Sequence, residues 1–330
     1  MPADLALLRQ TRQGRGGTRH GVNILPAMAP PERSAPRPLD AAALARVQRR
    51  LQAAAQPPWL HGEVARRMAL RLPVIKLQPT PVIEWGAFLG ASHAMLRQAY
   101  PHAQWLAVEA DATRRDATAA LHAQPWWSPR RWAGGAAAAV AEDAVLPGAG
   151  QLLWANMGLH GAADPQAVMK QWHRALAVDG FLMFSTLGPG SLPGLRALYA
   201  AQGWATPFAP FVDMHDLGDM LVAAGFADPV MDQELITLTW PSAQAALDEL
   251  RGLGGNVARL RFAGLRTPRW RQRLLRALGA TADANGRVAM VFEVVYGHAF
   301  RPAPRPRLAA QTELPLEDLR AMVRAGRRRD

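Results

Sequence analysis

Two carboxylates and a glycine-rich turn form the first pattern in this sequence with the chemistry of a ligand site. Glu84 lies near the end of a short apolar run, and Gly86 and Gly90 follow it in the segment EWGAFLG. Glu109 ends the next apolar run, 19 residues after Gly90. In open α/β sheets such a turn lets a ligand approach the backbone, and the acid binds the hydroxyl pair of a ribose. An ordinary strand–helix turn followed by a surface acid is the alternative, because Phe88 occupies one of the three glycine positions.

Polar side chains also follow two further apolar runs. Glu142 and Asp143 come after the run 136–141, and Asn156 comes after the run 151–155. Parallel strands end at one edge of a sheet, and ligands of open α/β sheets bind at that edge. We therefore expect these side chains and the two carboxylates above to line one cleft.

The elements that position these residues alternate between helical and strand-like periods. Short unbroken apolar runs separated by helices are typical of parallel strands that are buried on both faces. The sequence therefore predicts a doubly wound α/β fold, with Ser92 capping the helix after the glycine turn. We expect helices over 39–55, 60–72, 91–100, 111–123, 164–177, 192–202, 213–224 and 242–252, and strands over 81–85, 105–108, 136–141, 151–155, 181–185, 229–239 and 288–299.

Composition excludes several classes of protein. The chain has 330 residues, of which 49% are hydrophobic and 19% charged, as in a globular protein of one or two domains. The absence of cysteine excludes a disulfide scaffold, zinc fingers, iron–sulfur ligation and a thiol nucleophile, and the histidines are too scattered to suggest a metal site. The sequence contains no run of 18 uncharged apolar residues and no secretory signal. We expect a cytoplasmic monomer without a membrane span.

The net charge of +12 is unevenly distributed. Segments rich in arginine, glycine and proline at both ends predict a flexible arm over 1–38 and a basic tail over 301–330, which includes a candidate helix at 313–328. A single domain over 39–300 remains. Within it, residues 251–276 contain eight arginines and no acid.

Such a basic cluster is typical of a surface for nucleic acid, an anionic membrane or an acidic protein, and a solvated arginine-rich face is the alternative. Three tryptophans also lie beside two arginines in 126–132, where stacking of nucleic-acid bases is one interpretation. A partly buried loop at the edge of the sheet is the favoured interpretation of that segment.

Several segments together resemble the malonyl-acyl-carrier-protein O-methyltransferases of biotin synthesis, which are class I S-adenosylmethionine-dependent enzymes. The resemblance covers roughly 60–300 and implies a seven-stranded, mostly parallel, Rossmann-like sheet with substrate-cap helices within 192–276. The TLGPGSL segment and the VYGHA ending are more discriminating than the glycine turn. The matching segments are LHGEVARRM (60–68), IKLQP (75–79), WANMGLH (154–160), FSTLGPGSL (184–192), FVDMHDLG (211–218), AGF (224–226), LDELRGLGGN (247–256) and FEVVYGHA (292–299).

The resemblance also implies a site for S-adenosylmethionine, residue by residue. The glycine turn with Glu84 would border the methionyl part, and Glu109 would hold the ribose hydroxyls. Glu142, with Asp143 as the neighbouring candidate, would lie near the adenine, and Asn156 would open the loop beside the transferred methyl.

The chain departs from the family pattern at four places. Phe88 replaces the middle glycine, and 53–55 is Ala-Ala-Ala where a tyrosine is usual. Gly161 stands where a tryptophan is usual, and Gly194 where an acid is usual. The resemblance therefore implies a divergent member that clamps its substrate with different parts.

The partner implied by the resemblance is an acidic acyl carrier protein that carries a malonyl group. A malonyl carboxylate is ionised at neutral pH, so its methylation requires alignment and exclusion of water rather than a strong base. His160 is the candidate substrate contact, and a structural histidine is the alternative. The candidate docking residues are Arg259, Arg261, Arg266, Arg269 and Arg273.

Two functions follow from these observations. The first is methyl transfer from S-adenosylmethionine to the free carboxyl of malonyl-acyl carrier protein. The second is a binding or assembly factor that has kept the fold and lost turnover, because a fold does not dictate a reaction. Nucleic-acid methylation is disfavoured, since no Asn-Pro-Pro-Tyr-like motif follows the fourth strand.

Overall fold

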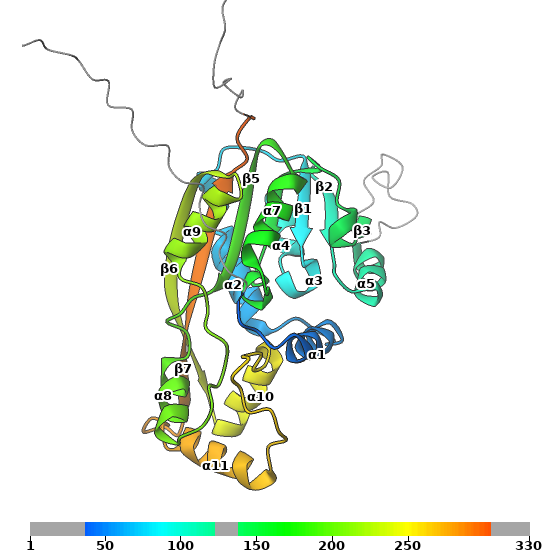
Figure 1. Cartoon of the computed structure of the whole chain (residues 1–330). Coiled ribbons are helices and arrows are strands. Elements are labelled where there is room, and N and C mark those ends of the chain that lie inside the picture. The colour runs from blue at the N-terminus through cyan, green and yellow to red at the C-terminus, as the bar shows by residue number, and fades with distance from the viewer. Residues whose placement is uncertain (1–36, 123–137, 305–330) are drawn as a thin grey trace, which may run out of the picture. The chain divides into compact units, whose positions relative to one another are not determined.

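The computed structural model describes residues 37–122 and 138–304 of the chain. Seven strands form one sheet in the order β3-β2-β1-β4-β5-β7-β6 (Figure 1). All neighbouring pairs are parallel except those made by β7, which runs antiparallel to both β5 and β6. The predicted doubly wound, mostly parallel sheet is confirmed. The strands are β1 (Pro81–Trp85), β2 (Gln104–Val108), β3 (Ala138–Val140), β4 (Gly150–Ala155), β5 (Leu176–Leu187), β6 (Ala227–Trp240) and β7 (Val288–Phe300).

Helices cover both faces of this sheet. The α-helices are α1 (Ala41–Gln52), α2 (Trp59–Ala69), α3 (Ala87–Gly90), α4 (His93–Ala99), α5 (Ala112–His122), α7 (Pro165–Ala175), α8 (Pro193–Ala201), α9 (Met214–Ala223), α10 (Ala243–Leu253) and α11 (Pro268–Gly279). Three 3₁₀ turns are η1 (Leu72–Val74), η2 (Glu142–Ala144) and η3 (Leu159–Gly161).

Successive side chains of the central strands β1, β4 and β5 enter two different hydrophobic cores, because side chains alternate across a strand. Val82 of β1 packs in a core with Leu60 and Leu96, from α2 and α4. Its neighbour Ile83 packs in the opposite core with Trp172 and Leu221, from α7 and α9. This burial on both faces explains why the parallel strands are recognisable as unbroken apolar runs.

The helix predicted over 91–100 differs from the prediction. Two helices, α3 and α4, occupy 87–99, and Ala91 between them has a left-handed φ of 53°. Ser92 precedes α4 but makes no capping hydrogen bond. Its hydroxyl donates to the Gly90 carbonyl at 2.8 Å and accepts from the indole of Trp154 at 2.7 Å. The expected cap is wrong because a strand side chain and the glycine turn compete successfully for the same hydroxyl.

Helices α8, α10 and α11 come from the segment where substrate-cap helices are expected. Figure 1 shows them at one end of the sheet, away from α7 and α9, with α10 beside α1. Helix α11 is missing from the sequence predictions, because four of its twelve residues are arginines and only Leu274 and Leu278 are buried. Its start nevertheless has a local signal: the Thr267 hydroxyl accepts from the Trp270 amide, and Pro268 occupies the first helical position.

Residues at both borders of the predicted domain are bonded to it. Arg37 donates from its backbone to the Ala163 carbonyl, and Arg301 donates from its backbone to the Gly180 carbonyl. Residues 1–36 of the predicted arm, residues 305–330 of the predicted tail with the candidate helix 313–328, and the loop 126–132 lie outside the described residues. Within the described part of the chain, none of the helices has the length and hydrophobicity that a membrane crossing requires. Nor do the described side chains include a group of metal-ligating residues arranged to hold a metal ion.

Candidate functional site

The glycine turn joins the ends of the first two strands. Gly86 has a φ of +68°, a left-handed conformation that glycine adopts without strain. Its amide donates to the Val108 carbonyl at the end of β2, at 2.8 Å. Glu109 follows Val108 directly, so the turn places this acid beside the segment 86–90.

Glu109 lies below the surface of this turn, with no exposed area. Its Oε1 accepts from the Phe88 amide at 2.6 Å and from the Thr118 hydroxyl at 3.2 Å. Its Oε2 is buried and has no hydrogen-bond partner among the described residues. Burial raises the pKa of this carboxyl, although the two hydrogen bonds oppose the shift.

Glu84 is buried on the other side of the turn, and only 1% of its area is exposed. Its Oε2 lies 3.1 Å from Nδ1 of His93, and its Oε1 has no hydrogen-bond partner among the described residues. Burial raises the pKa of Glu84 to about 8 and lowers the pKa of His93 to about 4. At neutral pH the contact therefore joins a mostly protonated carboxyl to a neutral imidazole.

Phe88 is half-buried, and the guanidinium of Arg114 lies over its ring, 3.5 Å from the centroid. Arg114 belongs to α5 and also donates to the carbonyls of Gln52 and Ala54, where α1 ends. The phenylalanine that departs from the family pattern is therefore part of a contact between three segments. No pattern in the sequence signals the role of Arg114.

Asn156 ties the end of β4 to the surrounding loops. Its Nδ2 donates to the carbonyls of His61 at 2.8 Å and Gly90 at 2.7 Å, and its Oδ1 accepts from the Ser185 hydroxyl at 2.6 Å. The side chain is 2% exposed. Protein partners therefore hold both of its polar atoms, and Asn156 positions the glycine turn and α2 rather than presenting its amide to a ligand.

Glu142 and Asp143 form the rim of this region. Both lie in η2, directly beyond β3, and both side chains are exposed. A hydrogen bond joins the side chains of Glu142 and Trp85, the last residue of β1. The prediction that Glu142 and Asp143 approach an adenine stays a prediction.

His160 lies between the glycine turn and the loop that follows α8. Its ring centroid is 6.3 Å from that of His61 and 6.2 Å from that of Phe211, nearly perpendicular to each. Burial lowers the pKa of His160 to about 3, and nearby His61 and Arg37 contribute. His160 is therefore a neutral imidazole, and its Nδ1 is buried without a partner among the described residues. The proposed contact with substrate stays a prediction.

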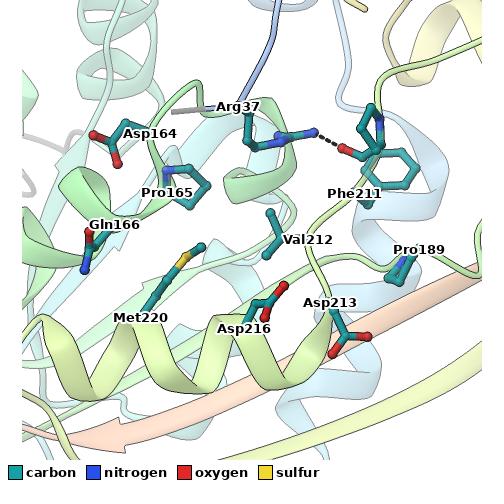
Figure 2. Close-up of a pocket in the computed structure, with 11 residues that line it drawn as sticks. Arg37, Asp164, Pro165, Gln166, Pro189, Phe211, Val212, Asp213, Asp216 and Met220 are labelled. Carbon is teal, nitrogen blue, oxygen red and sulfur yellow. Dashed lines mark hydrogen bonds between the residues drawn. The ribbon is translucent and has the colours of Figure 1, made fainter. Parts of the chain in front are cut away.

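A cavity of about 290 Å³ lies nearby, between the start of α7, the loop after β5, and α9 (Figure 2). Arg37 closes one side by donating to the Pro210 carbonyl at 2.6 Å, drawn as the dashed line in Figure 2. Three carboxylates line the cavity against this one guanidinium, so its charge does not favour an anionic ligand. They are Asp164, Asp213 and Asp216.

The two most discriminating segments of the sequence meet in space. The carboxylate of Glu293 in β7 accepts from the Gly190 amide, and the Glu293 carbonyl accepts from the Gly188 amide at 2.9 Å. The Ser191 hydroxyl exchanges hydrogen bonds with the Glu293 backbone, both at 3.0 Å. The TLGPGSL loop after β5 is thus fixed to the strand that ends in VYGHA. The two segments are therefore joined by hydrogen bonds between the loop after β5 and β7. Their spacing along the chain does not reveal this contact.

The five candidate docking arginines are not equivalent in the structure. Arg259, Arg269 and Arg273 are exposed. Arg266 lies over the rings of Phe262 and Trp270, at 4.0 and 4.2 Å from their centroids. Arg261 pairs with Asp40 of the N-terminal segment at 2.7 Å. This ion pair fastens the segment before α1 to the cap helices, so the charge of Arg261 is already paired within the protein.

The strand order, the antiparallel β7 and the glycine turn after β1 define this protein as a class I methyltransferase in fold. No protein-family model matches the chain. Among solved structures, the YcgJ protein from Bacillus subtilis aligns with a TM-score of 0.49 and 10% identity, over 72% of this chain and 99% of that protein.

Curated relatives define the family. The malonyl-acyl-carrier-protein O-methyltransferase of Laribacter hongkongensis is 40% identical over 254 residues, which span 75% of this chain and 84% of that protein. Proteins of the same name from Gallionella capsiferriformans and Nitrosospira multiformis are 36% and 34% identical. The first alignment spans 74% of this chain and the second 76%, and each spans 85% of the relative. The chain belongs to the malonyl-acyl-carrier-protein O-methyltransferase family.

Proposed function

We propose that this protein transfers a methyl group from S-adenosylmethionine to the free carboxyl of a malonyl group on an acyl carrier protein, in biotin synthesis. The observation that carries the proposal is the identity of 40% to a relative of that name, 84% of which is covered. The buried carboxyl groups of Glu84 and Glu109 beside the glycine turn also support it.

The chemistry of these residues fits the cofactor. Three buried atoms beside the turn have no partner among the described residues, namely Glu84 Oε1, Glu109 Oε2 and His61 Nε2. His61 Nδ1 lies 2.8 Å from the Leu89 carbonyl, which only accepts, so Nδ1 carries the hydrogen and Nε2 is an acceptor. S-adenosylmethionine has an ammonium and a ribose diol, which are donors for such acceptors.

When bound, this cofactor supplies a methyl group on a positively charged sulfur. Glu109 would hold the ribose hydroxyls, and Glu84 with His61 would face the ammonium. Asn156 keeps the turn and α2 in place, and Glu293 keeps the loop after β5 in place. The malonyl carboxylate is ionised at neutral pH, so alignment and a dry site are sufficient for the transfer.

The exposed arginines of the cap support docking of an acidic carrier protein. A positive surface raises the rate of association more than the final affinity. Replacing Arg259, Arg269 and Arg273 together with glutamate should slow methylation of the carrier-bound substrate about tenfold at low salt and flatten its salt dependence. Methylation of malonyl-coenzyme A, which has no carrier protein, is the control. Equal slowing of both substrates would contradict docking at this surface.

The alternative function, a binding or assembly factor without turnover, rests on one observation. Phe88 and Arg114 cover the side of the glycine turn where Glu109 is buried. Mass spectrometry of the carrier protein decides between the two functions. A mass gain of one methyl group in the presence of S-adenosylmethionine supports the enzyme, and an unchanged mass refutes it.

Glu109→Ala tests the location of the cofactor site. Loss of a charge-assisted hydrogen bond should weaken binding of S-adenosylhomocysteine by about 1–3 kcal/mol in calorimetric titration. Unchanged affinity would place the ligand elsewhere.

A further inference from the structure

One side chain joins three segments over the buried acid after β2. The guanidinium of Arg114 covers the ring of Phe88, whose amide donates to Glu109 at 2.6 Å. The same guanidinium donates to the carbonyls of Gln52 and Ala54, the latter at 2.9 Å. Arg114 therefore fastens the end of α1 to the glycine turn, and Glu109 has no exposed area beneath these contacts.

Unsatisfied polar atoms gather at the same place. Gln52 Oε1, Arg114 Nε and Glu109 Oε2 are all buried without a hydrogen-bond partner among the described residues. Buried polar groups normally have partners, and leaving them unpaired costs free energy. Glu109 Oε2 and Gln52 Oε1 accept hydrogen bonds, so they match a ligand with donors, such as a nucleoside. The unpaired Arg114 Nε is instead a cost of the closed contact.

We propose that Arg114 and Phe88 form a latch that closes over Glu109 and has to open before a nucleoside ligand binds. The inference rests on the proposed function, because the nucleoside is that of S-adenosylmethionine. Only molecules with an open latch bind, so the closed state lowers the apparent affinity in proportion to its population. The latch residues therefore set the rate at which the cofactor enters.

The direction of a mutational effect distinguishes a latch from a ligand contact. Arg114→Met keeps most of the length of the side chain and removes the guanidinium. If Arg114 is a latch, the variant binds S-adenosylhomocysteine more tightly and associates faster, by about tenfold, the factor that corresponds to about 1.4 kcal/mol. If Arg114 holds the ligand instead, the variant binds more weakly. Arg46→Met is the matched control, because Arg46 is exposed on α1.

Two readouts test the proposal on the full-length protein. Stopped-flow tryptophan fluorescence gives the association rate of S-adenosylhomocysteine, and calorimetry gives its affinity. Hydrogen exchange of the ligand-free protein follows 52–58, where we expect faster exchange in Arg114→Met than in wild type and in Arg46→Met. Weaker or unchanged binding, or unchanged exchange in this segment, would overturn the latch.

A second variant guards against a misleading result at one position. Phe88→Leu removes the ring that Arg114 covers and should also speed association, while the double variant should gain little beyond either single one, since both remove the same contact. Full additivity would overturn the latch. If neither wild type nor the variants bind the ligand at millimolar concentration, the proposed function is refuted, and hydrogen exchange still decides whether the latch exists.

Discussion

Replacing Glu84 with glutamine tests the electrostatics of the glycine turn, because it keeps the shape of the side chain and removes its titration. Burial raises the pKa of Glu84 from 4.5 to about 8. Folded molecules keep a proton on this carboxyl that unfolded molecules lose above pH 4.5. The free energy of unfolding therefore falls as pH rises from 4.5 to about 8. The fall is about 1.4 kcal/mol per pH unit, or about 5 kcal/mol over the whole window.

Urea denaturation of wild type and Glu84→Gln at pH 6, 7, 8 and 9 measures this effect. The variant should gain about 2 kcal/mol of stability relative to wild type between pH 6 and 8, and the difference should level off above pH 8. Other ionisable groups are common to both proteins, so their contributions largely cancel. A stability difference that is the same at every pH would refute a buried, protonated Glu84.

Two further substitutions test the VYGHA strand by the same denaturation experiment. Gly297→Ala should destabilise the fold by about 2–3 kcal/mol, because the added Cβ would overlap the buried ring of Phe184. Gly62→Ala, whose Cβ meets nothing within 4 Å, is the control, and equal urea midpoints for the two variants would contradict the packing argument. Tyr296→Phe should cost about 1–2 kcal/mol, because it removes the hydroxyl that donates to Glu234; unchanged stability would show that this bond contributes nothing.

The strands and the line of polar residues at their ends could be predicted from the sequence because both are local properties. A strand buried on both faces is a short apolar run, and the residue after it must lie at the carboxyl edge of the sheet. Glu109 and Asn156 obey this rule, and Glu84 lies one residue before the end of β1. The cofactor, the reaction and the substrate are implied only by the resemblance to a family, because the periodicity of apolar residues does not specify them.

Only the tertiary structure decided what these side chains touch. Asn156 is saturated by partners from α2, the glycine turn and β5, and Ser92 bonds to β4 instead of capping its helix. Arg114 meets Phe88 only because α5 and the glycine turn follow neighbouring strands. Hydrogen-bond partners depend on strand register and on competition between groups far apart in the chain, so they are fixed when the elements pack and not before.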